Sequence, residues 1–488
     1  MNTILIAESQ DRWLGHFEGV ETIDPRDYLS KPDPTLRRAT RVYNLSRSYA
    51  YQSMGYYVSL LAEARGHRPI PDVQTIQDLH GTAAVRLIPQ HLDELIQSSL
   101  KPLTTDDFVL SVYFGDNLAK KYDRLCKELY GLFQAPLLRF KFSRRNHWRL
   151  RRVSAIALNA VPENHREFVA EAAAKHFARR STRRPKRRST RYDMAILHNP
   201  DEGDLAPSDP AALKKLIKAA ESCGIAAELI TRSDSGRLME FDALFIRETT
   251  AVNHHTYRLA RRAAAAGMVV VDDPLSILRC TNKVYLAELL SRAKIPTPKT
   301  LVVHRRNAAE VAAELNFPCV LKRPDSAFSQ GVVKANDANE LMLQLTRFFA
   351  DSELVIAQEY MRTAFDWRIG VLDQRAVFAC KYHMARGHWQ IAKHETGRPQ
   401  PRFGKCETLP VEIAPRRAVA IAVKAANLIG NGLYGVDVKE VDGQFFVIEV
   451  NDNPNLDSGV EDAVLRDELY RRIMESFVRS IENNKQTS

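Results

Sequence analysis

Three oxygen-bearing side chains lie on two short apolar segments near the C-terminal end of the sequence. Asp437 lies in YGVDV, while Glu449 and Asn451 lie in VIEVND, and an Asp442-Gly443 pair separates the segments. An Asp-Gly pair between apolar runs is typical of a β-hairpin, and residues two apart on a strand share one face. Carboxylate and amide oxygens suit Mg²⁺ or Mn²⁺, with nucleotide phosphates completing the coordination. The spacing therefore predicts a metal site; the alternative is that the acids only form ion pairs with basic neighbours.

Two basic residues earlier in the chain could hold phosphate groups. Lys322 ends the apolar segment CVLK, and a loop of small residues, 326–331, follows it. Backbone N–H groups of such a loop can cradle phosphate oxygens. Arg368 follows Asp366 in the segment DWR, and its planar guanidinium can reach a reacting phosphate. Each pattern also occurs as an ordinary ion pair, but together with a metal site they supply what phosphoryl transfer needs.

The segment between these basic residues could bind a nucleobase. The apolar run LVIA leads into Gln358, Glu359, Tyr360 and Met361. Unpaired backbone N–H and C=O groups where a strand runs into a short linker can bind the edge of adenine. ATP is therefore the expected nucleotide.

The elements that must position these residues divide the sequence into regions. Residues 282–488 hold every residue named above and begin with a helix that carries Lys283 near its start and that Pro296 is expected to end. Residues 192–281 alternate between apolar strands and helices, which predicts a small parallel sheet covered by helices. No GxGxxG follows the first strand of that region, so nothing supports NAD binding there.

Residues 1–178 are predicted to form a further α/β domain, in which no catalytic constellation is recognised. Five tyrosines between Tyr43 and Tyr57 either face a ligand or, as is commoner, pack in the core and at its rim. Among the expected elements are strands at 3–7, 107–114 and 153–162 and helices within 53–65 and 117–133.

The composition is that of a globular protein with two to four domains. The chain has 488 residues, of which 45% are hydrophobic and 26% charged. No apolar stretch approaches the roughly 20 residues that cross a bilayer, and the first residues do not resemble a secretory signal. Six cysteines lie far apart without a CxxC pair, which favours reduced thiols in a cytoplasm and argues against a zinc site or a disulfide framework.

The basic charge is concentrated in one run. The net charge is +11, and residues 178–191, ARRSTRRPKRRSTR, contain no acid. One interpretation is a nucleic-acid or acidic-partner patch. The other is a solvated linker at 179–191, which the proline and the lack of stacking aromatic residues favour. Nucleic acid is therefore not the expected partner.

The ordered set Asn282-Lys283, VLKRP, QEYM, DWR, GVD and IEVNDNP resembles the RimK-like branch of the ATP-grasp superfamily. Its relatives include glutathione synthetases and peptide-carboxylate glutamate ligases. Residues 41–70 are similar to the domain found ahead of some RimK-like proteins. The implied fold is α/β multidomain, with an ATP-grasp domain at 282–488. It would be preceded by an N-terminal α/β domain at 1–178, the basic linker at 179–191 and a pre-ATP-grasp α/β domain at 192–281.

The resemblance also implies roles for individual residues. Cations on the nucleotide phosphates would be Lys283 and Lys322, with Ser326, Gln330 and Gly331 in the loop over them. The adenine would meet Gln358, Glu359, Tyr360 and Met361, with Asp366 also on the nucleotide side. Arg368 and Lys322 would act in catalysis together with Asn453, on the substrate side, and the metal ligands would be Asp437, Glu449 and Asn451.

One segment departs from the family pattern. Where RimK-like ligases carry Arg-Ser-Asn-x-His, the segment 387–397 has Gln390, Ile391 and Ala392, and only His394 keeps its place. The loss of a cation and an amide there bears on specificity for glutamate and leaves the ATP site intact.

The implied reaction joins a carboxylate to an amine through an acyl phosphate and releases ADP and phosphate. The implied substrates are an amino acid or peptide-like carboxylate and amine, with a protein C-terminus as one form of acceptor. Related enzymes form dimers or tetramers, so a homo-oligomer is an expectation, whereas a membrane partner is not. Two other functions stay open: phosphorylation of a hydroxyl, and non-catalytic binding of nucleic acid through the basic run.

Overall fold

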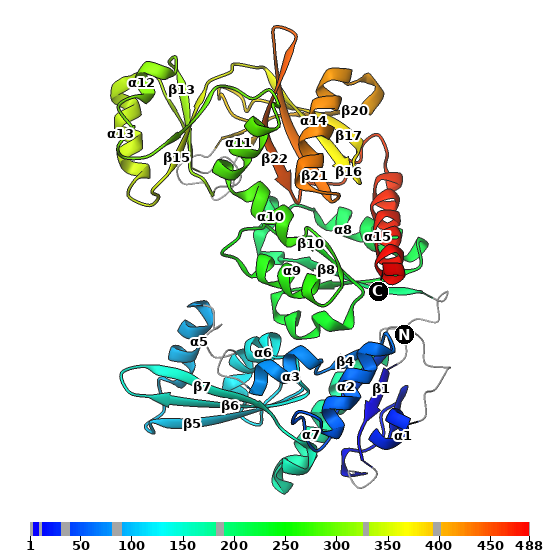
Figure 1. Ribbon diagram of the computed structural model, residues 1–488. Coiled ribbons are helices and arrows are strands. Elements are labelled where there is room, and N and C mark those ends of the chain that lie inside the picture. Colours follow the sequence, from blue (N-terminus) through cyan, green and yellow to red (C-terminus); the bar gives the residue numbers. More distant parts are fainter. Residues whose placement is uncertain are drawn as a thin grey trace. The chain divides into compact units, whose positions relative to one another are not determined.

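The computed structural model describes residues 3–8, 12–30, 40–80, 90–181, 190–325, 331–393 and 402–487. The chain forms two compact units (Figure 1). Unit 1 consists of residues 1–192 together with 233–240, and unit 2 consists of residues 193–232 and 241–488. None of the helices within these described ranges combines the length and the apolar character needed to cross a membrane.

Unit 1 begins with a parallel sheet in the order β2-β1-β3-β4. Alternate residues of β1 pack on opposite faces: Ile4 and Ile6 lie in one core cluster with Val58 of α2, whereas Leu5 lies in another with Val169 of α7. The alternation of a strand therefore gives the sheet a core on each side. The elements are β1 (Thr3–Ile6), β2 (Val20–Ile23), α1 (Pro25–Ser30), β3 (Arg41–Asn44), α2 (Met54–Ala64), β4 (Arg68–Ile70), α3 (Val73–His80) and α7 (Arg166–Ser181).

The tyrosines of this part of unit 1 divide between the core and the surface. Tyr43 and Tyr49 are buried, and their hydroxyls reach His176 and the carbonyl of Asn44. Tyr51 and Tyr57 are exposed, and each stacks edge-on against Tyr56.

The rest of unit 1 is an antiparallel sheet in the order β5-β6-β7. Its elements are α5 (Gln90–Leu100), β5 (Asp107–Tyr113), α6 (Asp123–Leu132), β6 (Leu137–Arg144) and β7 (Trp148–Ala155), with 3₁₀ turns at η1 (Arg12–Leu14), η2 (Lys120–Tyr122), η3 (Leu158–Ala160) and η4 (Glu163–His165). The helix expected over 117–133 begins later, and Leu118 is exposed. The strand expected over 153–162 was also placed too far along, because β7 ends at Ala155 and 3₁₀ turns follow.

A short segment from the middle of the chain belongs to unit 1. In η6 (Arg232–Glu240), the carbonyl of Gly236 accepts a hydrogen bond from Gln134 Nε2 at 2.9 Å. The ring of Tyr130 lies against Gly236, and Oε1 of Glu240 lies 3.7 Å from Nε2 of His176. The predicted domain boundaries at 179–191 and 281 remain a proposal. Residues 233–240 depart from them, because they lie within the predicted domain 192–281 but belong to unit 1.

Unit 2 contains the parallel sheet that the alternating segments predict, in the order β11-β10-β8-β9. Asp209 and Asp273 cap helices through their side chains, each followed by a proline at the first helical turn. The elements are β8 (Tyr192–His198), η5 (Pro200–Leu205), α8 (Pro210–Ser222), β9 (Ile225–Ile230), β10 (Ala243–Arg247), α9 (His255–Ala265), β11 (Val269–Val271), α10 (Pro274–Thr281) and the C-terminal helix α15 (Asp467–Thr487), which packs on α8 (Figure 1).

Two large antiparallel sheets and a two-stranded one, β18-β19, complete the described part of unit 2. Of the two large sheets, the smaller has the order β12-β15-β13-β14 and is covered by α13; the larger has the order β20-β17-β16-β21-β22 and is covered by α14. The elements are α11 (Lys283–Arg292), β12 (Thr300–Val303), α12 (Val311–Glu314), β13 (Cys319–Lys322), β14 (Val332–Ala335), α13 (Ala338–Phe348), β15 (Val355–Glu359), β16 (Phe365–Leu372), β17 (Arg375–His383), β18 (Ala392–Lys393), β19 (Arg402–Phe403), β20 (Cys406–Leu409), η7 (Val411–Ile413), α14 (Arg416–Ile429), β21 (Leu433–Val441) and β22 (Gln444–Asp452).

Local chemistry explains how the main elements of these sheets begin and end. The β21–β22 hairpin turns at Asp442 and Gly443, both with positive φ, as the sequence predicts. Asn282 caps α11 through its side chain, which places Lys283 at the first helical position. That helix ends at Arg292, and Lys294 takes a left-handed φ of 53°. Pro296 therefore lies beyond the helix end and does not terminate it.

Candidate active site

The two large antiparallel sheets and the strand ends of the parallel sheet line one cavity of about 1290 Å³ in unit 2. Of the predicted site residues that the structure describes, all but Gly331 line this cavity. They are Lys283, Lys322, Gln358, Glu359, Tyr360, Met361, Asp366, Arg368, Asp437, Glu449, Asn451 and Asn453. Ser326 and Gln330 lie outside the described residues, as does His394. Gly331 has a φ of 69° and its carbonyl accepts a hydrogen bond from the backbone of Arg323.

The larger sheet sets three charged side chains in a row. Arg368 on β16 lies directly opposite Asp437 on β21, and Asp437 lies opposite Glu449 on β22. Directly opposed residues on neighbouring strands project on the same face. Asn451 lies on that face too, because its Nδ2 donates to Asp437 Oδ2 at 3.1 Å. The hairpin register thus brings the three predicted metal ligands together.

Each carboxylate in this row has a basic partner. Arg368 holds both oxygens of Asp437, with Nη2 2.8 Å from Oδ2. Burial raises the pKa of Asp437, and Arg368 opposes that effect. Lys283 Nζ lies 2.8 Å from Glu449 Oε1. Burial acts to raise the pKa of Glu449, but Lys283 and then Lys322 outweigh it, so the pKa is lowered and the carboxylate is charged.

Lys322 is buried beside this row. Its ammonium donates to Gln358 Oε1 at 2.8 Å, and Gln358 in turn donates to Thr300 Oγ1. Burial is the main cause that lowers the pKa of Lys322 to about 8, while Glu449 acts in the opposite direction and the nearby Lys283 lowers it further. A buried ammonium with one neutral hydrogen-bond partner is well suited to an incoming phosphate.

Asp366 is paired with a lysine that the sequence analysis did not identify. Lys439 Nζ forms an ion pair with Asp366 Oδ1 and donates to Thr363 Oγ1 at 2.7 Å. Lys439 lines the cavity and lies two residues after Asp437 on β21, hence on the same strand face. The DVK spacing was the signal that could have revealed it.

The expected adenine end of the cavity carries aromatic rings. Tyr360 meets Trp389 edge-on with ring centroids 5.8 Å apart, and Lys334 Nζ lies over both rings. The backbone N–H of Glu359 donates to the carbonyl of Lys299. Trp389 had no motif to mark it, since it comes from the segment that departs from the family pattern. Its neighbours Gln390 and Ala392 also line the cavity.

Asn453 lies where β22 leaves the sheet, with a left-handed φ of 47°. Its Oδ1 accepts from Arg247 Nη1 at 2.6 Å, and its Nδ2 donates to the carbonyl of Glu248 at 2.6 Å. The amide group therefore joins the end of β22 to the end of β10 in this structure.

The cavity also has acidic lining residues that are close to Asn453 in the sequence. They are Asp452, Asp457 and Glu461, none of which was predicted from the sequence. Glu461 accepts from the hydroxyl of Tyr382 and from the backbone N–H of Asp457. Burial, above all, raises the pKa of Asp452 to about 7.

The row formed by Asp437, Glu449 and Asn451 fits Mg²⁺ chemically. The three side chains offer two carboxylates and one amide oxygen on one face of the β21–β22 hairpin. These are the hard oxygen donors that Mg²⁺ takes alongside nucleotide phosphates. The cations that now pair with the carboxylates would be drawn to those phosphates, which would leave the carboxylate oxygens available to a metal ion.

Comparison with known proteins identifies two family matches. Residues 280–468 match the RimK-like ATP-grasp domain, and residues 25–172 match the RimK-like ATPgrasp N-terminal domain.

Similar curated proteins carry the name "Probable alpha-L-glutamate ligase". The protein from Thioalkalivibrio sulfidiphilus is 27% identical over 230 residues, which is 46% of this chain and 73% of that protein. The protein from Teredinibacter turnerae is 28% identical over 240 residues, which is 48% of this chain and 76% of that protein.

Among solved structures, D-alanine–D-alanine ligase from Bacillus anthracis aligns with 61% of this chain and 99% of its own, at 15% identity and a TM-score of 0.47. A RimK domain ATP-grasp protein from Sphaerobacter thermophilus aligns with 58% of this chain and 98% of its own, at 18% identity and a TM-score of 0.44.

Proposed function

Because the chain belongs to the RimK-like ATP-grasp family, we propose that it joins a carboxylate to an amine at the expense of ATP. The observation that carries the proposal is the row of Arg368, Asp437 and Glu449 with Lys283 at its end. Two cations and two carboxylates on one face can hold the phosphates and a metal ion side by side. The cavity of about 1290 Å³ also exceeds the roughly 300–1,000 Å³ of a site for one small ligand.

In the proposed reaction, an oxygen of the acceptor carboxylate attacks the γ-phosphorus of ATP, and the bond to the bridging oxygen of ADP breaks. The amine then attacks the carbonyl carbon of the acyl phosphate, phosphate leaves, and the amine loses a proton. Lys283 and Lys322 hold the phosphates, and Arg368 faces the phosphoryl group in transfer. Mg²⁺ held by the Asp437 row would neutralise charge on the phosphate oxygens.

The acidic lining residues of the cavity support an amine substrate. An amine reaches the site mainly as an ammonium ion, and Asp457 and Glu461 are carboxylates that can hold its positive charge. Asp204 and Asp452 also line the cavity. This charge favours an amine without an additional carboxylate near its nitrogen over glutamate.

The experiment is a screen of amino acids, diamines and peptides for ADP release that depends on both an amine and a carboxylate. Mass spectrometry then identifies the product. An amide together with free phosphate supports the proposal. ADP release with the phosphate retained on the substrate would instead identify a kinase, and no coupled ADP release with any pair would count against ligation.

A further inference from the structure

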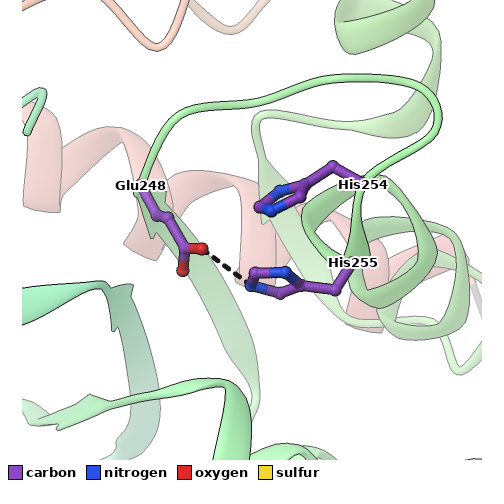
Figure 2. Close-up of side chains that lie close together, drawn as sticks. All are labelled: Glu248, His254 and His255. Carbon is purple, nitrogen blue, oxygen red and sulfur yellow. Dashed lines mark ion pairs between the residues drawn. The ribbon is translucent and has the colours of Figure 1, made fainter. Parts of the chain in front are cut away.

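A second group of side chains that could bind a metal ion lies on the segment that follows β10. It is separate from the proposed Mg²⁺ ligands Asp437, Glu449 and Asn451. Figure 2 shows Glu248 at the strand end, with His254 and His255 at the start of α9 pointing toward it. One ligand atom from each of the three side chains lies within 4.8 Å of the other two. Two imidazoles and a carboxylate thus converge from the two ends of a short loop.

The polar atoms of this group are buried and incompletely used. Glu248 is 1% exposed and His255 is 8% exposed. The two side chains are paired, with His255 Nε2 2.8 Å from Glu248 Oε1 (Figure 2). Glu248 Oε2 and both ring nitrogens of His255 make no hydrogen bond among the described residues, so the close contact between the two side chains lacks hydrogen-bond geometry. A simple ion pair would leave these buried atoms unsatisfied, which is costly, whereas a bound cation would use the carboxylate fully.

The third side chain is oriented by a neighbour. His254 Nδ1 lies 3.1 Å from Thr256 Oγ1, which can accept the ring N–H and leave Nε2 with a free lone pair. Metal-binding histidines are commonly oriented in this way, by an oxygen that accepts the proton of the other ring nitrogen. The rings of His254 and His255 lie 4.0 Å apart between centroids, so both can approach one ion.

We propose that Glu248, His254 and His255 bind one Zn²⁺ ion or a similar divalent transition-metal ion. Two imidazole nitrogens and one carboxylate oxygen suit Zn²⁺ and disfavour Mg²⁺, which takes oxygen ligands. Bonds of about 2.0–2.1 Å in a tetrahedral site hold ligand atoms roughly 3.3 Å apart, so a small rotation of the side chains completes the site. Water supplies the fourth ligand.

The location of the site gives it a positioning role. The loop between Glu248 and His254 contains residues 249–253, all of which line the active-site cavity. The carbonyl of Glu248 also accepts the hydrogen bond from Asn453 at the exit of β22. A metal ion bound to both ends of this loop would fix one wall of the cavity.

The test is a titration of the full chain, stripped of metal, with Zn²⁺ in excess Mg²⁺ and without nucleotide. Excess Mg²⁺ fills the oxygen sites, so Zn²⁺ retained after desalting reports a site of a different kind. The unmodified protein should retain one equivalent. Glu248→Gln, His254→Gln and His255→Gln should each lose it or bind at least about tenfold more weakly.

Two control variants make the test specific. His304→Gln removes an exposed histidine elsewhere in unit 2, and Asp437→Asn alters one of the proposed Mg²⁺ ligands. Both variants should still retain one equivalent of Zn²⁺. Zn²⁺ lost only from Asp437→Asn, or retained by all three ligand variants, would overturn the proposal. If those variants do not fold, X-ray absorption at the zinc edge of the unmodified protein decides. Two imidazoles support the site, whereas sulfur ligation or oxygen-only ligation contradicts it.

Discussion

Arg247 Nη1 donates to Oδ1 of Asn453 at 2.6 Å, which ties the last residue of β10 to the residue that follows β22. Arg247 is 1% exposed, and its other hydrogen bonds go to Ser208 and to the carbonyls of Pro207 and Pro454. The parallel sheet and the larger antiparallel sheet of unit 2 therefore meet at a buried guanidinium whose hydrogen-bond partners among the described residues are neutral groups.

Replacement of Asn453 by alanine should destabilise unit 2. It removes one acceptor from a buried arginine and leaves the carbonyl of Glu248 without its donor, which costs about 1–3 kcal/mol for each such group. Urea unfolding measures the effect, and Asn455→Ala is the control because the side chain of Asn455 donates locally, to Asp457 two residues on. Unchanged stability with lost ligation would show that Asn453 acts on the substrate instead.

The affinity for Mg-ATP should fall as the pH rises through about 8. The pKa of Lys322 is lowered to about 8, mainly by burial, so the free protein loses this positive charge above that pH. The profile of kcat/KM for ATP reports the free protein and should show the loss. In Lys322→Arg, whose guanidinium does not titrate in this range, the decline should disappear. The same inflection in that variant would assign the titration to another group.

Asp437→Asn should lower kcat by roughly a hundredfold or more. The change removes a carboxylate that we propose holds Mg²⁺, and with it the charged partner of Arg368, where the proposed reaction develops phosphate charge. ADP release at saturating ATP measures it. Glu440→Gln is the matched control: it is on the same strand, its carboxylate accepts from Trp367 Nε1, and it is outside the cavity lining. Equal losses in the two variants would indicate a general effect on the strand.

Nucleotide binding should change the fluorescence of Trp389. This ring meets Tyr360 edge-on at the expected adenine end, so a base entering there alters its surroundings. The emission of the protein should shift on addition of Mg-ADP, and Trp389→Phe should abolish the shift. Trp148→Phe, in unit 1, should retain it. A shift that survives the loss of Trp389 would place adenine elsewhere.

The sequence predicted the site best where one strand or one hairpin determines the geometry. Asp437, Glu449 and Asn451 could be placed together because a two-residue turn sets the register and strand periodicity sets the face. The fold class was also accessible, since strands and helices alternate plainly in residues 192–281, and the ATP-grasp fold is confirmed by the family match at 280–468.

Features that depend on contacts between distant segments could not be predicted. Glu461, between β22 and α15, lines the cavity beside Tyr382 of β17, whose hydroxyl donates to it. The pKa of Lys322 is lowered by burial and changed further by charged groups on other elements, among them Glu449 on β22 and Lys283 on α11. The end of α11 was misplaced for a local reason: the helix stops at Arg292, ahead of Pro296, because Lys294 takes a left-handed conformation.

The placement of residues 233–240 in unit 1 has a consequence for proteolysis. The basic run at 178–191 offers many sites to trypsin, yet a single cut there would leave two fragments that still share the fold of unit 1. The second fragment would keep Gly236 against Tyr130 and bonded to Gln134, and Glu240 beside His176. The nicked protein should elute from a sizing column as one species, and the fragments should separate only on denaturation. By the same reasoning, a truncation that begins at Tyr192 would leave this segment, with its buried Leu238, without the rest of its core.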